Sequence, residues 1–151
     1  MPVANLDTPV GRIAIVADDA HITRVTWSPR DEDGMTPLLA EAQDQLKAYF
    51  ENTLDSFDLP LAPRGTAFQQ QVYEAMKRIP LGETTTYGTI AKELGVPAQP
   101  VGQACGSNPI PIIIPCHRVL AAEGLGGFSG AGGVETKVQL LRHEGAYSLL
   151  I

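Results

Sequence analysis

The sequence Asn108-Pro109-Ile110-Pro111-Ile112-Ile113-Ile114-Pro115-Cys116-His117-Arg118-Val119 holds the densest chemical signal in this chain. Its prolines fix φ and cannot donate ladder hydrogen bonds, so we expect a rigid segment that does not form a central strand. The segment ends in a thiol, an imidazole and a guanidinium on consecutive residues. Because the thiolate is the nucleophilic form of cysteine, we expect His117 and Arg118 to lower the pKa of Cys116 and make it reactive.

Helices are expected before this segment. The motif Thr66-Ala67-Phe68-Gln69 matches a capping box and begins a helix with apolar residues at helical spacing. Thr86 can cap a second helix that Gly95 stops, and a short third helix follows over residues 98–105. Two short helices joined by a tight, glycine-containing turn have the outline of a helix-turn-helix.

A glycine-rich loop and one more helix are expected after this segment. The loop covers residues 124–133, and the helix covers residues 134–143. The helix is expected to bury Val134, Val138 and Leu141 on one face.

The first half of the chain predicts a small sheet and a helix. Residues 11–17 and 22–27 alternate well enough to form a hairpin, and residues 36–50 carry an apolar stripe at helical spacing. Residues 57–61 alternate again and can return a strand.

The 151 residues are enough for one compact domain or two small ones. Pro63 and Gly65 mark a boundary between them. We therefore expect an α+β architecture, with a sheet-and-helix domain over residues 1–64 and a helical domain over residues 65–151 that contains the helix-turn-helix.

The charge of the chain is unevenly placed. Its net charge is −6, and residues 1–64 hold five basic and eleven acidic residues, whereas the rest of the chain is balanced. Phosphate attraction supplies most of the non-specific affinity for DNA, so we expect at best weak, salt-sensitive DNA binding.

The sequence predicts a cytoplasmic protein without a membrane partner. No run approaches the ~20 apolar residues that span a bilayer, and the first residues form no secretory signal. The two cysteines make no disulfide framework, as expected in a reducing compartment.

The run Pro115–Val119, with Asn108 upstream and Gly126-Gly127-Phe128-Ser129-Gly130 downstream, resembles the O6-alkylguanine-DNA alkyltransferases, also called methylated-DNA–protein-cysteine methyltransferases. The resemblance is strong over residues 65–146. It implies a winged helix-turn-helix and a single-turnover DNA repair enzyme. The cysteine of such an enzyme irreversibly takes the alkyl group from O6 of guanine, and by extension from O4 of thymine, in DNA. The implied partner is double-stranded DNA carrying O6-alkylguanine, and the resemblance implies a monomer without a cofactor.

The resemblance also implies catalytic roles for single residues. Cys116 matches the nucleophile, and His117 matches the residue that removes its proton through a water molecule. On an extended chain these neighbours point opposite ways, which disfavours a direct bond. Glu144 matches the carboxylate that orients the histidine, although a solvated carboxylate at a helix end competes with this interpretation. Asn108 matches an asparagine that braces the turn.

A further group matches the surface that contacts DNA and the base. Its members are Tyr87 beside a target-strand phosphate, Ser129 on the loop that walls the guanine pocket, Ala98 and Gly102 on a small minor-groove face, Arg118, and Gln99. Gln99 stands where the family has an arginine that enters the duplex, and Pro100 replaces a residue that is usually small. Both changes predict weaker duplex binding than is usual in the family.

Other functions remain open beside alkyl transfer. A divergent relative that binds damage, or that dealkylates small molecules, would also fit the loss of the arginine at position 99. A thiol hydrolase fits poorly because its histidine normally lies far from the cysteine in sequence. A plain helix-turn-helix regulator leaves the proline-rich segment unexplained.

His21 and Cys105 are expected to have no direct part in the chemistry, and the role of Lys137 is left open. Residues 1–64 contain no cysteine and one histidine, His21, so no metal site is predicted. Cys105 is expected to be a small packing residue, and Lys137 fits a solvated lysine at least as well as a functional one.

Overall fold

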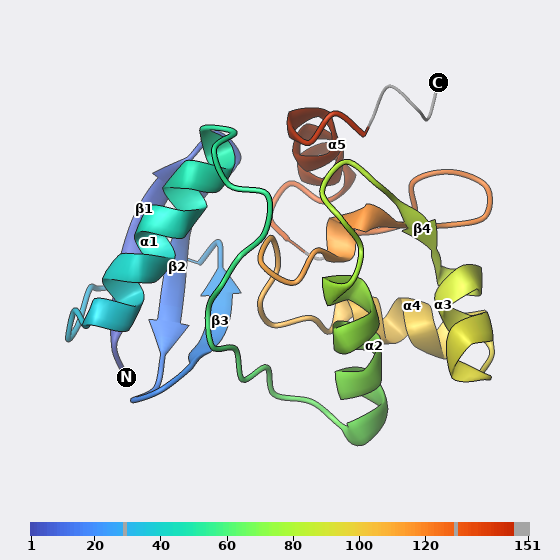
Figure 1. Ribbon diagram of the computed structural model, residues 1–151, viewed down its shortest axis with the longest axis horizontal. Helices are drawn as coiled ribbons and strands as arrows, with labels where there is room; N and C mark the ends of the chain where they lie inside the picture. Colours follow the sequence, from blue (N-terminus) through green and yellow to red (C-terminus); the bar gives the residue numbers. More distant parts are fainter. Residues whose placement is uncertain (29, 129, 147–151) are drawn as a thin grey trace. The chain divides into compact units, whose positions relative to one another are not determined.

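The computed structural model describes residues 1–28, 30–128 and 130–146 (Figure 1). The chain divides into two compact units, the first from Met1 to Arg64 and the second beginning at Gly65.

The first unit is a three-stranded antiparallel sheet with one helix packed on it (Figure 1). Its elements are β1 (Val3–Thr8), β2 (Gly11–Ala17), β3 (Ile22–Thr26) and α1 (Pro37–Phe50), and the strand order is β1-β2-β3. The hydroxyl of Thr36 accepts a hydrogen bond from the amide of Leu39 and caps α1. The predicted hairpin and helix are confirmed, whereas β1 was not predicted.

The strand expected over residues 57–61 is wrong. Only Leu61 forms an isolated bridge with Ile22, flanked by hydrogen bonds from the Ile22 amide to the Pro60 carbonyl and from the Ala62 amide to the Ile22 carbonyl. Pro60 has no amide hydrogen to donate, so a regular ladder cannot continue through it.

The second unit is mainly helical (Figure 1). Its helices are α2 (Ala67–Lys77), α3 (Tyr87–Leu94), α4 (Ala98–Gly106) and α5 (Val134–His143). The predicted capping box is present: the Thr66 hydroxyl accepts from the Gln69 amide at 3.1 Å, and the Gln69 side chain accepts from the Thr66 amide at 2.8 Å. α3 begins after Thr86 and ends at Gly95, which takes the left-handed conformation with φ of 70°. The predicted α+β class is confirmed.

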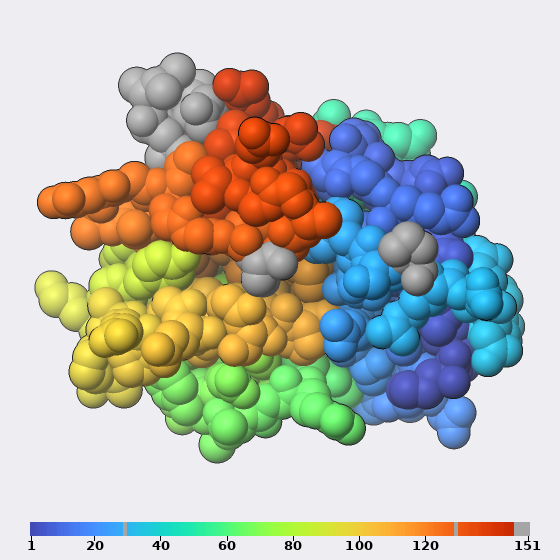
Figure 2. Space-filling model, turned by 180° about the vertical axis from the view of Figure 1, so that it is seen from behind, coloured from blue at the N-terminus to red at the C-terminus, as the bar shows by residue number. Residues whose placement is uncertain are grey.

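Three residues join α3 to α4, as the helix-turn-helix outline requires. α4 packs against both α2 and α3. A two-stranded parallel pair, β4 (Thr85–Thr86) with β5 (Val119–Leu120), ties the start of α3 to the segment that follows Cys116. The glycine-rich loop, orange in Figure 2, lies on the surface of this unit beside the yellow helical part.

The buried face of α5 differs from the predicted one. Val134 is 43% exposed, whereas Thr136, Lys137, Leu140 and Leu141 are buried. In the described ranges, every helix is too short or too polar to traverse a lipid bilayer.

Candidate active site

The proline-rich segment folds as a series of turns whose residues from Ile110 to Leu120 are all buried. Ile112 lies in the left-handed region with φ of 73°, a conformation that a β-branched residue rarely adopts. The segment leads into a single 3₁₀ turn, η1 (Cys116–Arg118). The expectation of an extended chain at Cys116 and His117 is therefore wrong.

Asn108 braces the bend that leads to Cys116. Its side-chain nitrogen donates to the Ile114 carbonyl at 2.8 Å, and its side-chain oxygen accepts from the Ile110 amide at 3.0 Å. These bonds tie both ends of the bend to one side chain, which is only 6% exposed. The asparagine amide thus replaces the ladder hydrogen bonds that the prolines prevent.

His117, Glu144 and Arg118 form one buried network. Nε2 of His117 lies 2.6 Å from Oε2 of Glu144. Arg118 donates from Nε and Nη2 to the two carboxylate oxygens at 2.8 and 3.0 Å, and from Nη1 to the Ile79 carbonyl at 2.7 Å. Because its guanidinium is occupied in this way, Arg118 does not line the pocket described below. The carboxylate of Glu144 lies at the C-terminal end of α5 but is buried, not solvated.

The network fixes the charges of its members. Burial alone would raise the pKa of Glu144, but the hydrogen bonds from His117 and Arg118 outweigh it and lower the pKa to about 2. Burial lowers the pKa of His117, and the carboxylate opposes this only in part, so the imidazole is neutral. Since a carboxylate only accepts, we place the imidazole proton on Nε2, which leaves Nδ1 as an acceptor. Nδ1 is buried and has no hydrogen-bond partner among the described residues.

The charge state of Cys116 differs from the predicted one. Burial raises the pKa of the thiol, and a hydrogen bond with Asn108 and the charge of Lys137 oppose this only in part. From His117 only a backbone hydrogen bond lowers it, because the imidazole is neutral, and Arg118 does not lower it because its guanidinium is paired with Glu144. Cys116 is therefore a thiol at rest, and it needs a base to become a nucleophile.

Lys137 is a candidate functional residue whose role the sequence left open. It is fully buried, and its Nζ donates to the Val119 carbonyl at 2.7 Å and to the Gly127 carbonyl at 3.0 Å. Nζ lies 5.9 Å from the centroid of the Tyr87 ring, within the range of a cation–π contact. Burial lowers the pKa of Lys137 to about 8. The sequence carries one weak signal of this burial, since Lys137 precedes Leu140 and Leu141 by three and four positions on α5.

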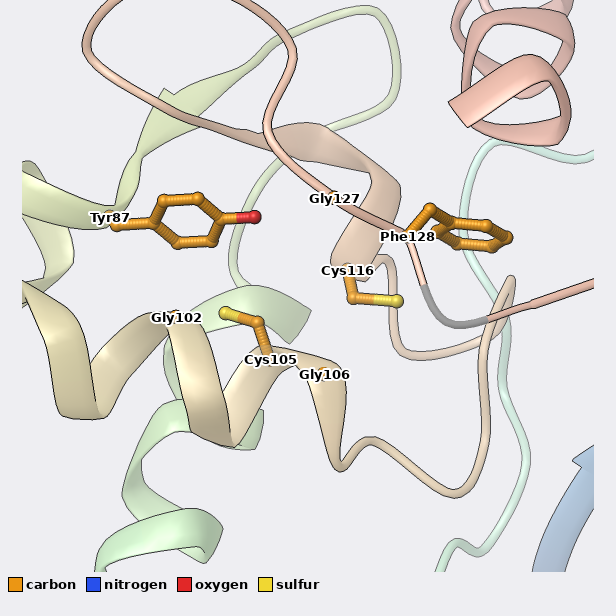
Figure 3. Close-up of a pocket in the computed structure, with 7 residues that line it drawn as sticks. All are labelled: Tyr87, Gly102, Cys105, Gly106, Cys116, Gly127 and Phe128. Atoms are coloured by element: carbon orange, nitrogen blue, oxygen red, sulfur yellow. The ribbon is translucent and has the colours of Figure 1, made fainter. Parts of the chain in front are cut away.

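A pocket of about 330 Å³ opens at Cys116 (Figure 3). It is lined by Tyr87, Gly102, Cys105, Gly106, Cys116, Gly127 and Phe128. In Figure 3, Tyr87 and Phe128 lie at its two ends, and Gly127 lies opposite α4. The Tyr87 hydroxyl accepts a hydrogen bond from the Gly127 backbone, while burial raises the pKa of this phenol.

The pocket brings together some of the predicted site residues. Cys116, Tyr87 and Gly102 line it, and Asn108, His117 and Glu144 support the turn that carries the thiol. Ala98 and Gln99 are exposed at the start of α4 and do not line it. Ser129 lies outside the described residues. Among the residues in the described ranges, no group of three or more His, Cys, Asp or Glu side chains could hold a metal ion.

Two family models match the chain. Residues 67–146 match the 6-O-methylguanine DNA methyltransferase, DNA binding domain, and residues 3–63 match the ribonuclease-like domain of the same proteins. The chain belongs to the 6-O-methylguanine DNA methyltransferase family. The resemblance inferred from Pro115–Val119 is thereby confirmed, and the 6-O-methylguanine DNA methyltransferase models together cover both halves of the chain.

Individual relatives of the 6-O-methylguanine DNA methyltransferase family match over most of their length. A methylated-DNA–protein-cysteine methyltransferase of Methanosarcina acetivorans is 42% identical over 97% of this chain and 99% of its own. The constitutive enzyme of that name from Bacillus subtilis is 40% identical over 91% and 92%. A solved structure from Mycobacterium tuberculosis, in complex with DNA, has a TM-score of 0.85 and 40% identity, and the match covers 97% of this chain and 94% of that one.

Proposed function

We propose that this chain repairs DNA by transferring an alkyl group from O6 of guanine, and by extension from O4 of thymine, irreversibly to Cys116. One observation carries the proposal: the Cys116 thiol lines an open pocket, and the adjacent His117 is a neutral imidazole held by Glu144, whose Nδ1 has no hydrogen-bond partner in the described part of the chain. This is the order nucleophile, base and orienting group that activates a buried thiol. Each molecule acts once, because a thioether does not return the alkyl group.

The reaction follows from the charges in the site. A water between Sγ and Nδ1 carries the thiol proton to His117, and the new imidazolium is stabilised by the Glu144 carboxylate. An electron pair of the thiolate forms the new S–C bond to the alkyl carbon. The bond between that carbon and O6 breaks, and its electron pair stays with the purine. The purine anion then takes up one proton, which balances the proton that the thiol lost. The positive charge of Lys137 stabilises both the thiolate and the departing purine.

Other residues position the reacting groups. Asn108 holds the turn that presents Cys116, and Arg118 holds both carboxylate oxygens of Glu144 so that the carboxylate faces His117. Arg118 is therefore proposed as a positioning residue and not as a DNA contact.

We assign the binding of double-stranded DNA carrying O6-alkylguanine to α4 and its surroundings, within a domain over residues 65–151 that follows an N-terminal domain over residues 1–64. Ala98 and Gly102 keep one face of α4 small, which suits a close approach to the minor groove, and Tyr87 and Ser129 would contact the nucleotide. Gln99 would take the place of the flipped nucleotide. Since α4 carries no basic residue, the duplex is held weakly. We propose that the protein binds DNA as a monomer. Both free thiols suit a reducing compartment such as the cytoplasm.

An adduct assay tests the proposal. The protein is incubated with single- and double-stranded oligonucleotides carrying O6-methylguanine, and its peptides are analysed by mass spectrometry. We expect a gain of one methyl group on Cys116, none on Cys105, and no reaction in Cys116→Ala. Cys105 is an internal control because it lines the same pocket, where burial raises its pKa to about 12. An unmodified Cys116, with both DNA forms, would refute the proposal.

The uncharged surface of α4 favours one alternative, a protein that binds damage or dealkylates small molecules and holds duplex DNA too weakly to repair it. The free base O6-benzylguanine distinguishes the two. Modification of Cys116 by the free base, with no reaction on any DNA, would support the alternative.

A further inference from the structure

The hydroxyl of Tyr73 is a buried polar group that the described part of the chain leaves unpaired. Tyr73 lies on α2 and is 1% exposed, and its hydroxyl has no hydrogen-bond partner among the described residues. A buried hydroxyl without a partner destabilises a fold, and phenylalanine would fill the same space without that cost. Packing alone therefore does not account for the hydroxyl.

The ring that carries this hydroxyl is held closely at its edge. A Cβ built on Gly65 would lie 3.2 Å from a ring carbon of Tyr73 and 2.8 Å from the side-chain oxygen of Gln69. That oxygen is itself fixed, because it accepts a hydrogen bond from the Thr66 amide in the capping box of α2. The backbone before α2 thus limits the movement of the ring and gives the hydroxyl a fixed environment.

The phenol lies near both thiols of the second unit. α2 packs against α4, and α4 carries Cys105. Burial raises the pKa of Tyr73, and negative charge on Cys105 or Cys116 would raise it further, so both sulfurs are within electrostatic reach of the phenol. No direct hydrogen bond joins the hydroxyl to either sulfur. A bridging water is the smallest group that can connect a buried donor to a thiol in this way.

The phenol acts on the thiols from outside the pocket. Cys105 projects from α4 and Cys116 from η1, and both line the pocket (Figure 3). Tyr73 is buried and does not line it. A substrate that fills the pocket therefore does not displace the hydroxyl, which keeps its place during the reaction.

A second buried atom without a partner among the described residues complements the phenol. It is Nδ1 of His117, which accepts a proton, whereas the phenol can donate a hydrogen bond. Because its pKa is raised, the phenol of Tyr73 keeps its proton and does not compete with His117 as a base. The two groups suit two different parts of one event, the removal of the thiol proton and the stabilisation of the thiolate that remains.

We propose, on the basis of the alkyl transfer to Cys116 described above, that Tyr73 is a positioning residue whose hydroxyl donates to an enclosed water, and that this water donates to Sγ of Cys116. The water stabilises the thiolate that forms when His117 takes up the thiol proton. No bond of Tyr73 is made or broken. Burial opposes the ionisation of Cys116, and this pair of hydrogen bonds offsets part of that opposition.

The test uses Tyr73→Phe, which removes the hydroxyl and keeps the ring. Tyr49→Phe is the matched control, since it removes the hydroxyl of a buried tyrosine in the first unit. The rate at which iodoacetamide modifies Cys116 is followed by mass spectrometry across the alkaline pH range, with the Cys105 peptide followed separately. We expect Tyr73→Phe to raise the midpoint of the Cys116 profile by about 0.5–1 pH unit, and Tyr49→Phe to leave it unchanged.

The rate of alkyl transfer gives a second readout. Below the midpoint, Tyr73→Phe holds less thiolate, so the single-turnover rate of methyl transfer from single-stranded DNA carrying O6-methylguanine should fall about threefold or more at neutral pH. Other groups also act on the thiol, and all are the same in the three proteins: Cys105, Asn108, the His117 backbone, Tyr87, and Lys137, whose pKa is about 8. A difference between the profiles therefore reports the hydroxyl alone.

The two proposals fail in different ways. Modification by iodoacetamide does not depend on alkyl transfer, so an unchanged midpoint in folded Tyr73→Phe, or an equal shift in Tyr49→Phe, overturns the role of Tyr73 alone. A wild type that takes no methyl group on Cys116 refutes the proposed function. Thermal unfolding checks that each variant is folded. A crystal structure of the wild type adds a test without substitution: a water should bridge the Tyr73 hydroxyl and Sγ of Cys116, and a dry site there would also overturn the proposal.

Discussion

Nε2 of His117 and Oε2 of Glu144 lie 2.6 Å apart, and neither side chain has exposed surface. Because the carboxylate can only accept, this hydrogen bond places the imidazole proton on Nε2 and leaves Nδ1 unprotonated and able to accept a proton. The same carboxylate also pairs with the buried guanidinium of Arg118. The one charge of Glu144 therefore orients the base His117 and stabilises the folded protein.

Glu144→Gln is therefore expected to impair both chemistry and stability. We expect the single-turnover rate of methyl transfer to fall about 10²-fold or more, because the base loses its orienting charge. Unpairing the buried Arg118 should lower the free energy of unfolding by about 3 kcal/mol. Rates measured at a temperature where both proteins are fully folded separate the effects. A variant that unfolds more easily but reacts at the wild-type rate would contradict the role of Glu144.

Acid should destabilise the fold in two steps. The pKa of Glu144 is about 2 in the folded protein against 4.5 for an ordinary glutamate, so between these values the unfolded chain holds more protons. Its contribution, about 3 kcal/mol, is present above pH 4.5 and is lost as the pH falls towards 2. His117 acts in the same direction at higher pH, because its lowered pKa makes the unfolded chain protonate first below about 6.5.

Urea unfolding at a series of pH values tests this expectation. The free energy of unfolding of the wild type should decrease below pH 4.5 more steeply than that of Glu144→Gln, which lacks the titrating carboxylate. Parallel pH profiles for the two proteins would be inconsistent with a carboxylate held ionised by His117 and Arg118.

Lys137→Met should slow alkyl transfer and loosen the glycine-rich loop. The substitution keeps the length of the side chain but removes the charge and both hydrogen bonds, to the carbonyls of Val119 and Gly127. We expect the rate with free O6-benzylguanine to fall at least tenfold, and amide hydrogen exchange at residues 124–128 to accelerate. Lys92→Met, at an exposed position of α3, is the matched control. Equal rates of alkyl transfer for Lys137→Met and Lys92→Met would show that Lys137 has only a structural role.

Gln99→Arg should strengthen the hold on duplex DNA without changing the chemistry. Gln99 is exposed at the start of a helix that has no basic residue, so an arginine there can reach a phosphate. The slope of log affinity against log salt should steepen by about 0.9 for each new phosphate contact, and the reaction on duplex DNA should accelerate. Gln99→Leu controls for side-chain size, and the rate with the free base should stay the same in both. If Gln99→Leu gains as much affinity for duplex DNA as Gln99→Arg, the lack of a positive charge at position 99 does not explain the weak binding.

Local signals in the sequence predicted the helices well. The capping box at Thr66, the cap at Thr86 and the stop at Gly95 act within one helical turn, and each lies where it was expected. β1 was not predicted because its sequence contains Asn5 and Asp7, and these residue types are rare in strands. Pairing with β2 along its whole length overrides that preference.

The site was harder to predict, because burial and charge depend on contacts distant in sequence. The identity of Cys116 and His117 followed from the motif, but the pKa of the thiol was predicted to fall and instead rises with burial. Lys137 fitted a solvated lysine at least as well as a functional one, since lysine is rarely buried, and the carbonyls of Val119 and Gly127 explain its burial. No local pattern specifies these acceptors.

The charge division between the two compact units has a consequence for the kinetics of encounter. Residues 1–64 carry the whole net charge of −6, and in the second unit two of the six basic side chains, Arg118 and Lys137, are buried. At low ionic strength, where the Debye length reaches about 30 Å, a polyanion is therefore repelled well before contact. Added salt should first quicken association by screening that repulsion, the reverse of what cationic DNA-binding proteins display.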